Sequence, residues 1–154
     1  MASRSALFLD WGGTLALARN NRTVVDGHGR PVLMPNVTET LVRVRPQFDA
    51  CFIASNQARI GRGDITEDEV IRRIRWLNEQ LGGLFTDWRL CPHDDDDRCE
   101  CRKPKGGMIT ELADLYGVDL ASSTMVGDQE VDRQAGDAAG VGEFVFAKDF
   151  FGWK

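Results

Sequence analysis

The sequence has no long apolar run and no excess of basic residues. No segment of its 154 residues approaches the roughly 20 consecutive apolar residues of a membrane span, so we expect no membrane partner. The opening Met-Ala-Ser-Arg-Ser contains no apolar signal-peptide core, and we therefore expect a cytoplasmic protein. The formal net charge of −5 argues against nucleic acid as a partner, because phosphate backbones are bound mainly through clustered Lys and Arg.

Short apolar runs alternate with helical patterns along the chain, which is 42% hydrophobic. The expected strands are Ala6 up to Asp10, Ala50–Ala54, Trp88–Leu90, Ser123–Val126 and Glu143–Phe146. The expected helices run over about 36–45, 66–81 and 107–116, with a last small-residue helix around Ala135–Gly140. This alternation predicts a single α/β domain over residues 1–154, a three-layer, doubly wound parallel sheet of Rossmann-like type. No insertion is long enough for a large cap domain.

Local signals add detail in two regions. Thr66 and Glu69 form a capping box for the helix that follows them, and Asn36 is expected to cap the preceding helix. Two short β-type pieces, Thr23–Val25 and Val32–Met34, flank a Gly-rich turn. They predict a hairpin or flap beside the site.

Asp10 directly follows the first apolar run and precedes paired glycines. In an open parallel sheet, ligands bind beyond the carboxyl ends of the strands, so a carboxylate at this place faces a crevice. Asp10 is therefore the first candidate for chemistry. The alternative interpretation is that Asp10 starts a turn, because Asp followed by Gly is a common turn signal.

The cysteines separate into one core residue and one candidate metal site. Cys51 lies in an expected buried strand and is interpreted as a core residue. The other cysteines crowd around one histidine, in the order Cys91, His93, Cys99 and Cys101. Three thiols and one imidazole close a tetrahedral shell, which predicts a structural Zn²⁺; free thiols or a redox pair are the alternatives. Four aspartates in the same loop are interpreted as a solvated tip, since no calcium-loop spacing is present.

Four segments resemble, in order, the motifs of the haloacid dehalogenase (HAD) superfamily. They are Phe8–Leu15, similar to motif I (D-x-D-x-T); Ser55–Gly63, similar to [ST]-N-Q-x-x-I-x-R-G; Cys99–Met108, similar to C-x-C-R-K-P-x-P-G-M; and Gly127–Asp132, which matches GDxxxD. The longer patterns resemble those of the capless branch that contains the D-glycero-D-manno-heptose 1,7-bisphosphate and histidinol-phosphate phosphatases. Gly106 stands where that branch usually has a second proline.

This resemblance implies a role for each matching residue. It implies Asp10 as the nucleophile that attacks a phosphoryl group, Ser55 as a hydrogen-bonding partner of that group, and Lys103 as the cation that offsets its charge. It implies Mg²⁺ held by Asp10, the backbone carbonyl of Gly12, Asp128 and Asp132, and Zn²⁺ in the cysteine loop. The candidate substrate-binding residues are Asn56, Arg62, Arg102 and His28. The implied partner is a small phosphorylated metabolite such as a sugar phosphate.

One residue departs from motif I. Gly12 stands in place of the second Asp, which in the superfamily acts as general acid and base, a contribution of typically about 10²- to 10⁴-fold. His28, at the tip of the expected hairpin, is considered as a replacement acid or substrate contact; the alternative is a solvated turn residue.

Three classes of function remain open. The first is a phosphatase that is slow, acts on a good leaving group, or takes its acid from elsewhere. The second is a binding or regulatory protein that lost turnover. The third is C–P bond cleavage like that of phosphonoacetaldehyde hydrolase, ranked last because that enzyme uses a cap lysine. We favour the phosphatase. The aromatic tail, Phe150–Trp153, covers the core or forms an oligomer contact, so the sequence leaves the oligomeric state open.

Overall fold

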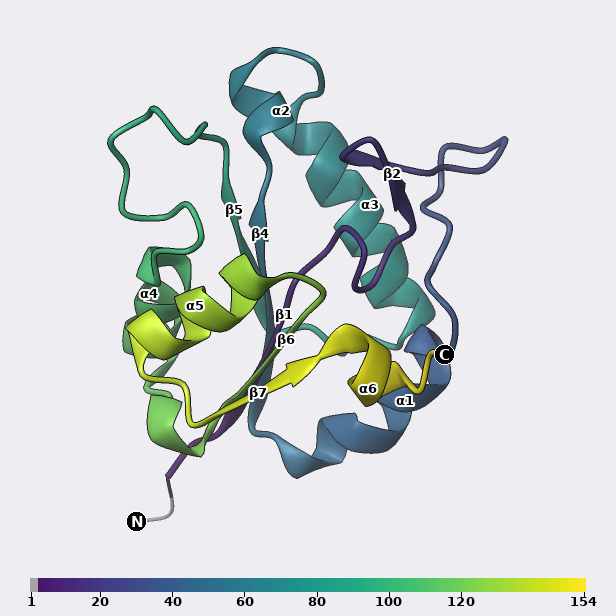
Figure 1. Ribbon diagram of the computed structural model, residues 1–154. Helices are drawn as coiled ribbons and strands as arrows, with labels where there is room; N and C mark the ends of the chain where they lie inside the picture. Colours follow the sequence, from purple (N-terminus) through teal and green to yellow (C-terminus); the bar gives the residue numbers. More distant parts are fainter. Residues whose placement is uncertain (1–2) are drawn as a thin grey trace.

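A five-stranded parallel sheet forms the centre of the protein (Figure 1). The computed structural model describes residues 3–154. The strands are β1 (Ala6–Leu9), β4 (Ala50–Asn56), β5 (Asp87–Cys91), β6 (Thr124–Gly127) and β7 (Glu143–Phe146). They lie in the order β5–β4–β1–β6–β7, and every neighbouring pair is parallel. The predicted α/β class and parallel sheet are confirmed.

Helices cover both faces of this sheet (Figure 1). One face carries α1 (Val37–Val44), α3 (Glu67–Gln80) and α6 (Ala147–Phe151), and the other carries α4 (Gly107–Tyr116) and α5 (Glu130–Ala139). Leu7 and Leu9 of β1 pack with the first group, whereas Ala6 and Phe8 pack with the second. Successive side chains of a strand point to opposite faces, so a strand buried on both sides is apolar at every position. The three-layer prediction is therefore confirmed.

Three shorter elements complete the chain outside the hairpin region. They are the one-turn helix α2 (Ala58–Gly61) and the 3₁₀ turns Arg45–Gln47 and Leu120–Ser122. No helix within residues 3–154 combines the length and apolar character needed to cross a bilayer.

The two expected helix caps differ in outcome. The Thr66 hydroxyl accepts a hydrogen bond from the Glu69 amide at 3.2 Å, as predicted. Asn36 precedes α1, but its side chain makes no cap bond and instead donates to the Phe151 carbonyl at 3.0 Å. The capping prediction for Asn36 is wrong because its backbone is left-handed (φ 65°), whereas capping residues usually hold an extended conformation.

The segment after β1 forms a nested hairpin rather than the single one expected. The expected pairing is present, since the Val32 amide donates to the Val24 carbonyl at 2.9 Å. A second antiparallel pair precedes it in the sequence and is formed by β2 (Ala18–Arg19) and β3 (Arg22–Thr23). Its turn residues, Asn20 and Asn21, have φ values of 52° and 61°, the positive values that a two-residue hairpin turn needs. The Trp11 indole donates to the Thr23 hydroxyl at 3.1 Å and ties this hairpin to the end of β1.

The aromatic tail packs on the core. Phe151 is 3% exposed and stacks on Trp153, with ring centroids 5.4 Å apart. The Trp153 indole donates to the Pro35 carbonyl at 2.6 Å. Of the two expectations for this tail, the structure shows it covering the core beside α1.

Candidate active site and metal-binding clusters

Three carboxylates meet at the carboxyl edge of the central strands. Asp10 follows β1, Asp128 follows β6, and Asp132 lies in the first turn of α5. One oxygen of each lies within 4.8 Å of the other two. The Asp10 amide donates to the Val126 carbonyl at 3.1 Å, and the Asp132 carboxylate accepts from the Gln129 backbone amide at 3.0 Å, so the Asp10 backbone and the Asp132 side chain are both held. The sheet thus brings together the residues expected to hold Mg²⁺.

Lys103 lies between two of these carboxylates. Its ammonium donates to Asp10 Oδ1 at 2.9 Å and to Asp132 Oδ1 at 2.6 Å, and its side chain is 2% exposed. Asn56 holds the backbone of Lys103, accepting from its amide at 2.9 Å and donating to its carbonyl at 3.2 Å. The amide of Asn56, expected to bind substrate, is therefore engaged in positioning the lysine.

Burial shifts the pKa values of the three carboxyl groups and of Lys103. It raises the pKa of Asp10 and of Asp132 above the usual aspartate range, and Lys103 offsets that rise only in part. Burial also raises the pKa of Asp128. For Lys103, burial lowers the pKa, but the carboxylates of Asp10 and Asp132 outweigh it, so the pKa lies above the ordinary value. The lysine is therefore charged at neutral pH, and a further cation beside the carboxylates would lower their pKa values again.

The donor set fits magnesium. Three carboxylate oxygens within 4.8 Å of one another are hard ligands of the kind Mg²⁺ prefers, and Mg²⁺ usually completes its octahedron with water and substrate phosphate. Asp128 is exposed, whereas Asp10 and Asp132 are buried, so the group is open on one side. A metal bound here keeps positions for a ligand.

The paired glycines after Trp11 have different surroundings. Gly13 has φ +77°, and a Cβ at this position would lie 2.3 Å from Asp128 Oδ2, so only glycine allows the loop to approach that carboxylate. A Cβ on Gly12 would meet the Cβ of Ala18 at 3.6 Å, an ordinary contact. Position 12 thus has room for a Cβ, which the sequence does not supply.

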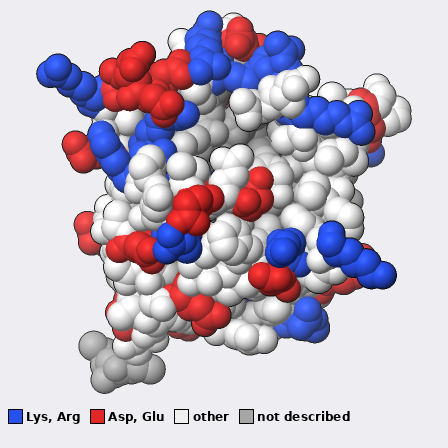
Figure 2. All heavy atoms as spheres, in the orientation of Figure 1, with Lys and Arg blue, Asp and Glu red and all other residues white. Residues whose placement is uncertain are grey.

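A cavity of about 790 Å³ opens over the carboxylates. Ser55 lines it, and the hydroxyl of this residue accepts from the side-chain amide of Gln57, Nε2, at 3.0 Å. Five arginines also line it: Arg22, Arg59, Arg62, Arg73 and Arg102. Figure 2 shows this hollowed face with basic side chains along part of its edge.

Arg73 of α3 is a cavity residue that sequence reasoning missed. From the sequence, Arg72, Arg73 and Arg75 are interpreted as a solvated face, because their spacing sets them off the apolar stripe of the helix. No local signal distinguishes Arg73 from its neighbours, since only the placement of α3 beside the strand ends brings it to the cavity.

Two expected substrate residues are ion-paired with the aspartate-rich loop. Arg62 forms a two-pronged pair with Asp94, with Nε donating at 2.8 Å. Arg102 donates from Nε to Asp95 at 2.6 Å and from Nη1 to the His93 carbonyl at 3.0 Å. Part of the predicted solvated tip therefore binds arginines at the cavity edge.

His28 lies away from the carboxylates. Its turn closes on itself, because Asp26 accepts from the amides of His28 (2.8 Å) and Arg30 (3.0 Å), and it projects beyond α3 (Figure 1). His28 does not line the main cavity but a separate hollow of about 320 Å³ with Trp76. His28 thus lies outside the lining of the cavity over the carboxylates, and its role as replacement acid or substrate contact stays a prediction.

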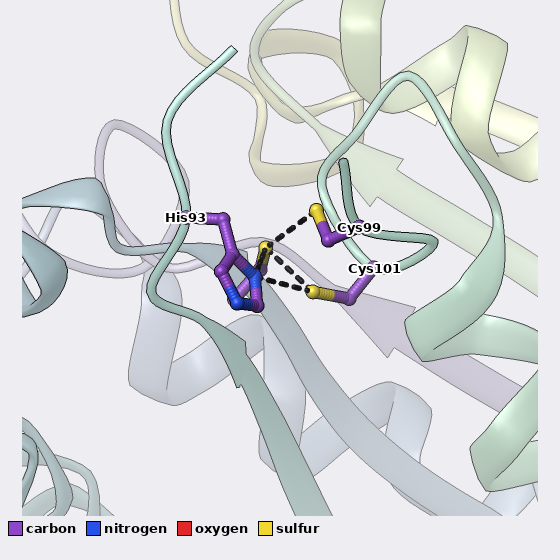
Figure 3. A group of neighbouring side chains, drawn as sticks. His93, Cys99 and Cys101 are labelled. Carbon is purple, nitrogen blue, oxygen red and sulfur yellow. Dashed lines mark hydrogen bonds between the residues drawn. The ribbon is translucent and has the colours of Figure 1, made fainter. Parts of the chain in front are cut away.

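The four thiol and imidazole ligands form a second cluster. Figure 3 shows His93, Cys99 and Cys101 pointing toward one another. The Cys91 sulfur lies 3.4 Å from His93 Nδ1 and 3.8 Å from the Cys99 sulfur, and His93 Nδ1 lies 3.2 Å from the Cys101 sulfur. Sulfur and nitrogen donors in this number fit a closed tetrahedral Zn²⁺.

Hydrogen bonding favours thiolate at one ligand of this cluster. Burial raises the pKa of Cys99, but the Arg102 amide and other hydrogen bonds to its sulfur outweigh this and bring the pKa to about 7. Burial raises the pKa of Cys91 to about 12. A cluster that starts from one thiolate is able to accept a metal, which displaces the remaining thiol protons.

Comparisons with known proteins agree with this geometry. A family model described as "HAD-hyrolase-like" matches residues 100–147. The D-glycero-beta-D-manno-heptose-1,7-bisphosphate 7-phosphatase of Rhodopseudomonas palustris is 33% identical over 93% of this chain and 83% of its own length. The phosphatase of the same name from Pseudomonas aeruginosa is 35% identical, over 88% and 77%.

A solved structure extends the comparison to the fold. The D,D-heptose 1,7-bisphosphate phosphatase of B. bronchiseptica, complexed with magnesium and phosphate, superposes with a TM-score of 0.79. It is 28% identical, and the match covers 90% of this chain and 78% of that one.

Proposed function

The chain belongs to the HAD-like hydrolases, in the family of the heptose-1,7-bisphosphate 7-phosphatases, and on this basis we propose that it is a magnesium-dependent phosphatase. We propose a small phosphorylated metabolite of the sugar phosphate type as its substrate, in line with the names of its relatives. The observation that carries the proposal is the buried contact of Lys103 with Asp10 and Asp132 at the strand ends.

Asp10 serves as the nucleophile in this proposal. A carboxylate oxygen of Asp10 attacks phosphorus, an aspartyl phosphate forms, and water later releases phosphate. Lys103 and the Ser55 hydroxyl hold the phosphoryl oxygens, and the lysine offsets the charge that they share with Asp10. Asp10, Asp128, Asp132 and the Gly12 carbonyl would hold Mg²⁺, which supplies charge neutralisation at the phosphoryl group.

The cysteine loop serves a structural role in this proposal. Zn²⁺ held by its three thiolates and His93 would fix the loop that leads directly into Arg102 and Lys103. The ion pairs of Arg62 with Asp94 and of Arg102 with Asp95 fasten the same loop to the cavity edge.

A binding or regulatory protein is the second candidate, and Gly12 is the observation that favours it. Without an acid at this position, release of an alkoxide is slower by about 10²- to 10⁴-fold. C–P cleavage through a Schiff base is less suited to the site. Lys103, the lysine among the described residues that line the cavity, is bonded to two carboxylates and held in the charged form.

The test is phosphate release from a panel of sugar phosphates with Mg²⁺. We expect measurable turnover in the wild type and a fall of at least about 10³-fold in Asp10→Asn, because the nucleophile is lost. Asp114→Asn, an exposed aspartate of α4, is the matched control and should retain activity. Phosphate binding without release from any phosphoryl donor would favour the binding protein instead.

A further inference from the structure

The cavity contains no evident proton donor for a leaving group. Within residues 3–154, no histidine lines it. Its arginines cannot donate a proton at neutral pH, and Lys103 is held between two carboxylates. Asp128 and Asp132 belong to the group that suits a metal.

The remaining carboxylates of the cavity lie on its exposed edge. Asp95 is 85% exposed at its side chain and is paired with Arg102. Asp64 and Glu69 are exposed, one after α2 and the other in the first turn of α3. A general acid must reach the leaving oxygen directly or through one water, and position 12, two residues from Asp10, carries no side chain.

We propose that Gly12 makes this site favour phosphoryl donors whose leaving group departs unprotonated, namely acyl phosphates and phosphoanhydrides, and makes hydrolysis of the aspartyl phosphate on Asp10 the slow step. The proposal rests on the phosphatase function above and replaces the sugar phosphate named there, as the preferred substrate, with a more reactive phosphoryl donor. Sugar phosphate esters are then slow substrates of the same site.

The first step needs no proton from the protein. An oxygen of Asp10 forms a bond to phosphorus while the bond from phosphorus to the leaving oxygen breaks, and the electron pair stays on that oxygen. An acyl phosphate releases a carboxylate and a phosphoanhydride releases a phosphate, both of which are stable anions in water. A sugar ester releases an alkoxide, which needs a proton to depart at a useful rate.

The second step lacks a base. Water attacks phosphorus, the bond from phosphorus to Asp10 breaks, and its electron pair returns to the carboxylate. The proton of the water remains on the phosphate product or passes to solvent, because position 12 offers no group to take it. The aspartyl phosphate on Asp10 is therefore hydrolysed more slowly than it forms from a reactive donor.

The basic edge of the cavity suits an anionic leaving group. Arg22, Arg59 and Arg73 line the cavity, and none of them is in an ion pair with a carboxylate of the described chain. Guanidinium groups bind carboxylate and phosphate through paired N–H donors. They would stabilise the departing negative charge by hydrogen bonding, without transferring a proton.

The chain allows a clean substitution at position 12. Gly12 is outside the positive-φ glycines, and an added Cβ meets only an ordinary contact with Ala18. Gly12→Asp restores a carboxyl group that can give and take a proton, and Gly12→Asn is a control of the same shape that cannot.

The experiment compares kcat/KM for acetyl phosphate and glucose 6-phosphate with Mg²⁺ in the three proteins. In the wild type we expect acetyl phosphate to be favoured by at least about 10²-fold, the lower range of a lost general acid. Gly12→Asp should raise the glucose 6-phosphate value by at least about 10-fold, and Gly12→Asn should not. Equal rates for both donors in the wild type would overturn the inference while the phosphatase function stands. Failure of all three proteins on both donors would overturn the phosphatase function as well.

A second measurement follows the intermediate. With saturating acetyl phosphate, acid-quenched wild-type protein should carry phosphate on Asp10, detected by peptide mass spectrometry, with a burst of about one acetate per chain. Gly12→Asp should reduce both signals. Turnover of acetyl phosphate by the wild type with no burst and no trapped phosphoaspartate would show that hydrolysis of the intermediate is not the slow step.

Discussion

The two candidate metal-binding clusters are built in opposite ways. The sulfur and imidazole ligands lie in one continuous stretch, residues 91–101, and they close around one point. The carboxylates come from two strand ends and a helix start, and their lysine lies 93 positions along the chain from Asp10. The first cluster has four ligands and suits a buried structural ion, whereas the second has three and opens into a cavity. A local cluster organises its own loop, and a dispersed cluster requires the whole sheet.

The two clusters nevertheless include residues that are close together in the sequence. Cys101 is a ligand of the first, Arg102 pairs with the loop of that cluster, and Lys103 belongs to the second. The position of the lysine therefore depends on the cysteine loop on one side and on Asn56 of β4 on the other.

Loss of the zinc ligands should have the largest effect. Structural zinc binds small domains with apparent free energies of about 10–16 kcal/mol, and here it would hold the loop before Lys103. We expect about one zinc per purified wild-type chain and less than about half in Cys101→Ser, measured by elemental analysis, with loss of phosphatase activity. Cys51→Ala removes a thiol outside the cluster and should keep its zinc. Equal zinc in all three proteins would contradict a closed four-ligand site.

Removal of the buried lysine should come next. Lys103→Met leaves Asp10 and Asp132 without their cation, and breaking a buried ion pair costs about 3–5 kcal/mol in the free energy of unfolding. Chemical denaturation measures this loss. Lys148→Met, at an exposed position of α6, is the control and should change stability little. A loss below about 1 kcal/mol for Lys103→Met would show that the carboxylates are accommodated in another way.

Magnesium should stabilise the open cluster to a smaller extent. At a concentration 100 times its Kd, a ligand specific for the folded state adds about 2.7 kcal/mol, or roughly 5–10 °C in the thermal midpoint of a chain of this size. We expect this rise in MgCl₂ for the wild type and its loss in Asp128→Asn, an exposed position whose substitution should leave the fold intact. An equal rise in both proteins would place the ion elsewhere.

The smallest effect concerns the acid limb of the pH–rate profile. Burial raises the pKa of Asp10, so the ionised nucleophile should be lost at a higher pH than for an ordinary aspartate as the medium is acidified. Mg²⁺ favours the carboxylate, and a higher Mg²⁺ concentration should therefore move this limb to lower pH. An acid limb that does not shift with Mg²⁺ concentration would show that the titrating group is not a ligand of the metal.

The parts of the site that depend on a short stretch of sequence could be predicted. The strand ends at Asp10 and Asp128 follow from apolar runs, and the cysteine loop follows from ligand spacing alone. Contacts between distant loops were not predictable. The pairing of Arg102 with Asp95 and the approach of Arg73 to the cavity depend on how separate segments meet in space. The turn at Asn20 and Asn21 is a different case, since both residues adopt positive φ, a conformation that asparagine tolerates and that a two-residue hairpin turn needs, so the sequence did carry a local signal for it.

The adjacent glycines after Trp11 bear on how this protein could change over time. A side chain at position 13 would push the loop away from Asp128. Selection that maintains the site would therefore remove such a mutation. Gly12 has no such constraint, since an added Cβ there makes only an ordinary contact. The chemistry absent from this chain is therefore one amino-acid substitution away, at a position where the backbone leaves room for a Cβ.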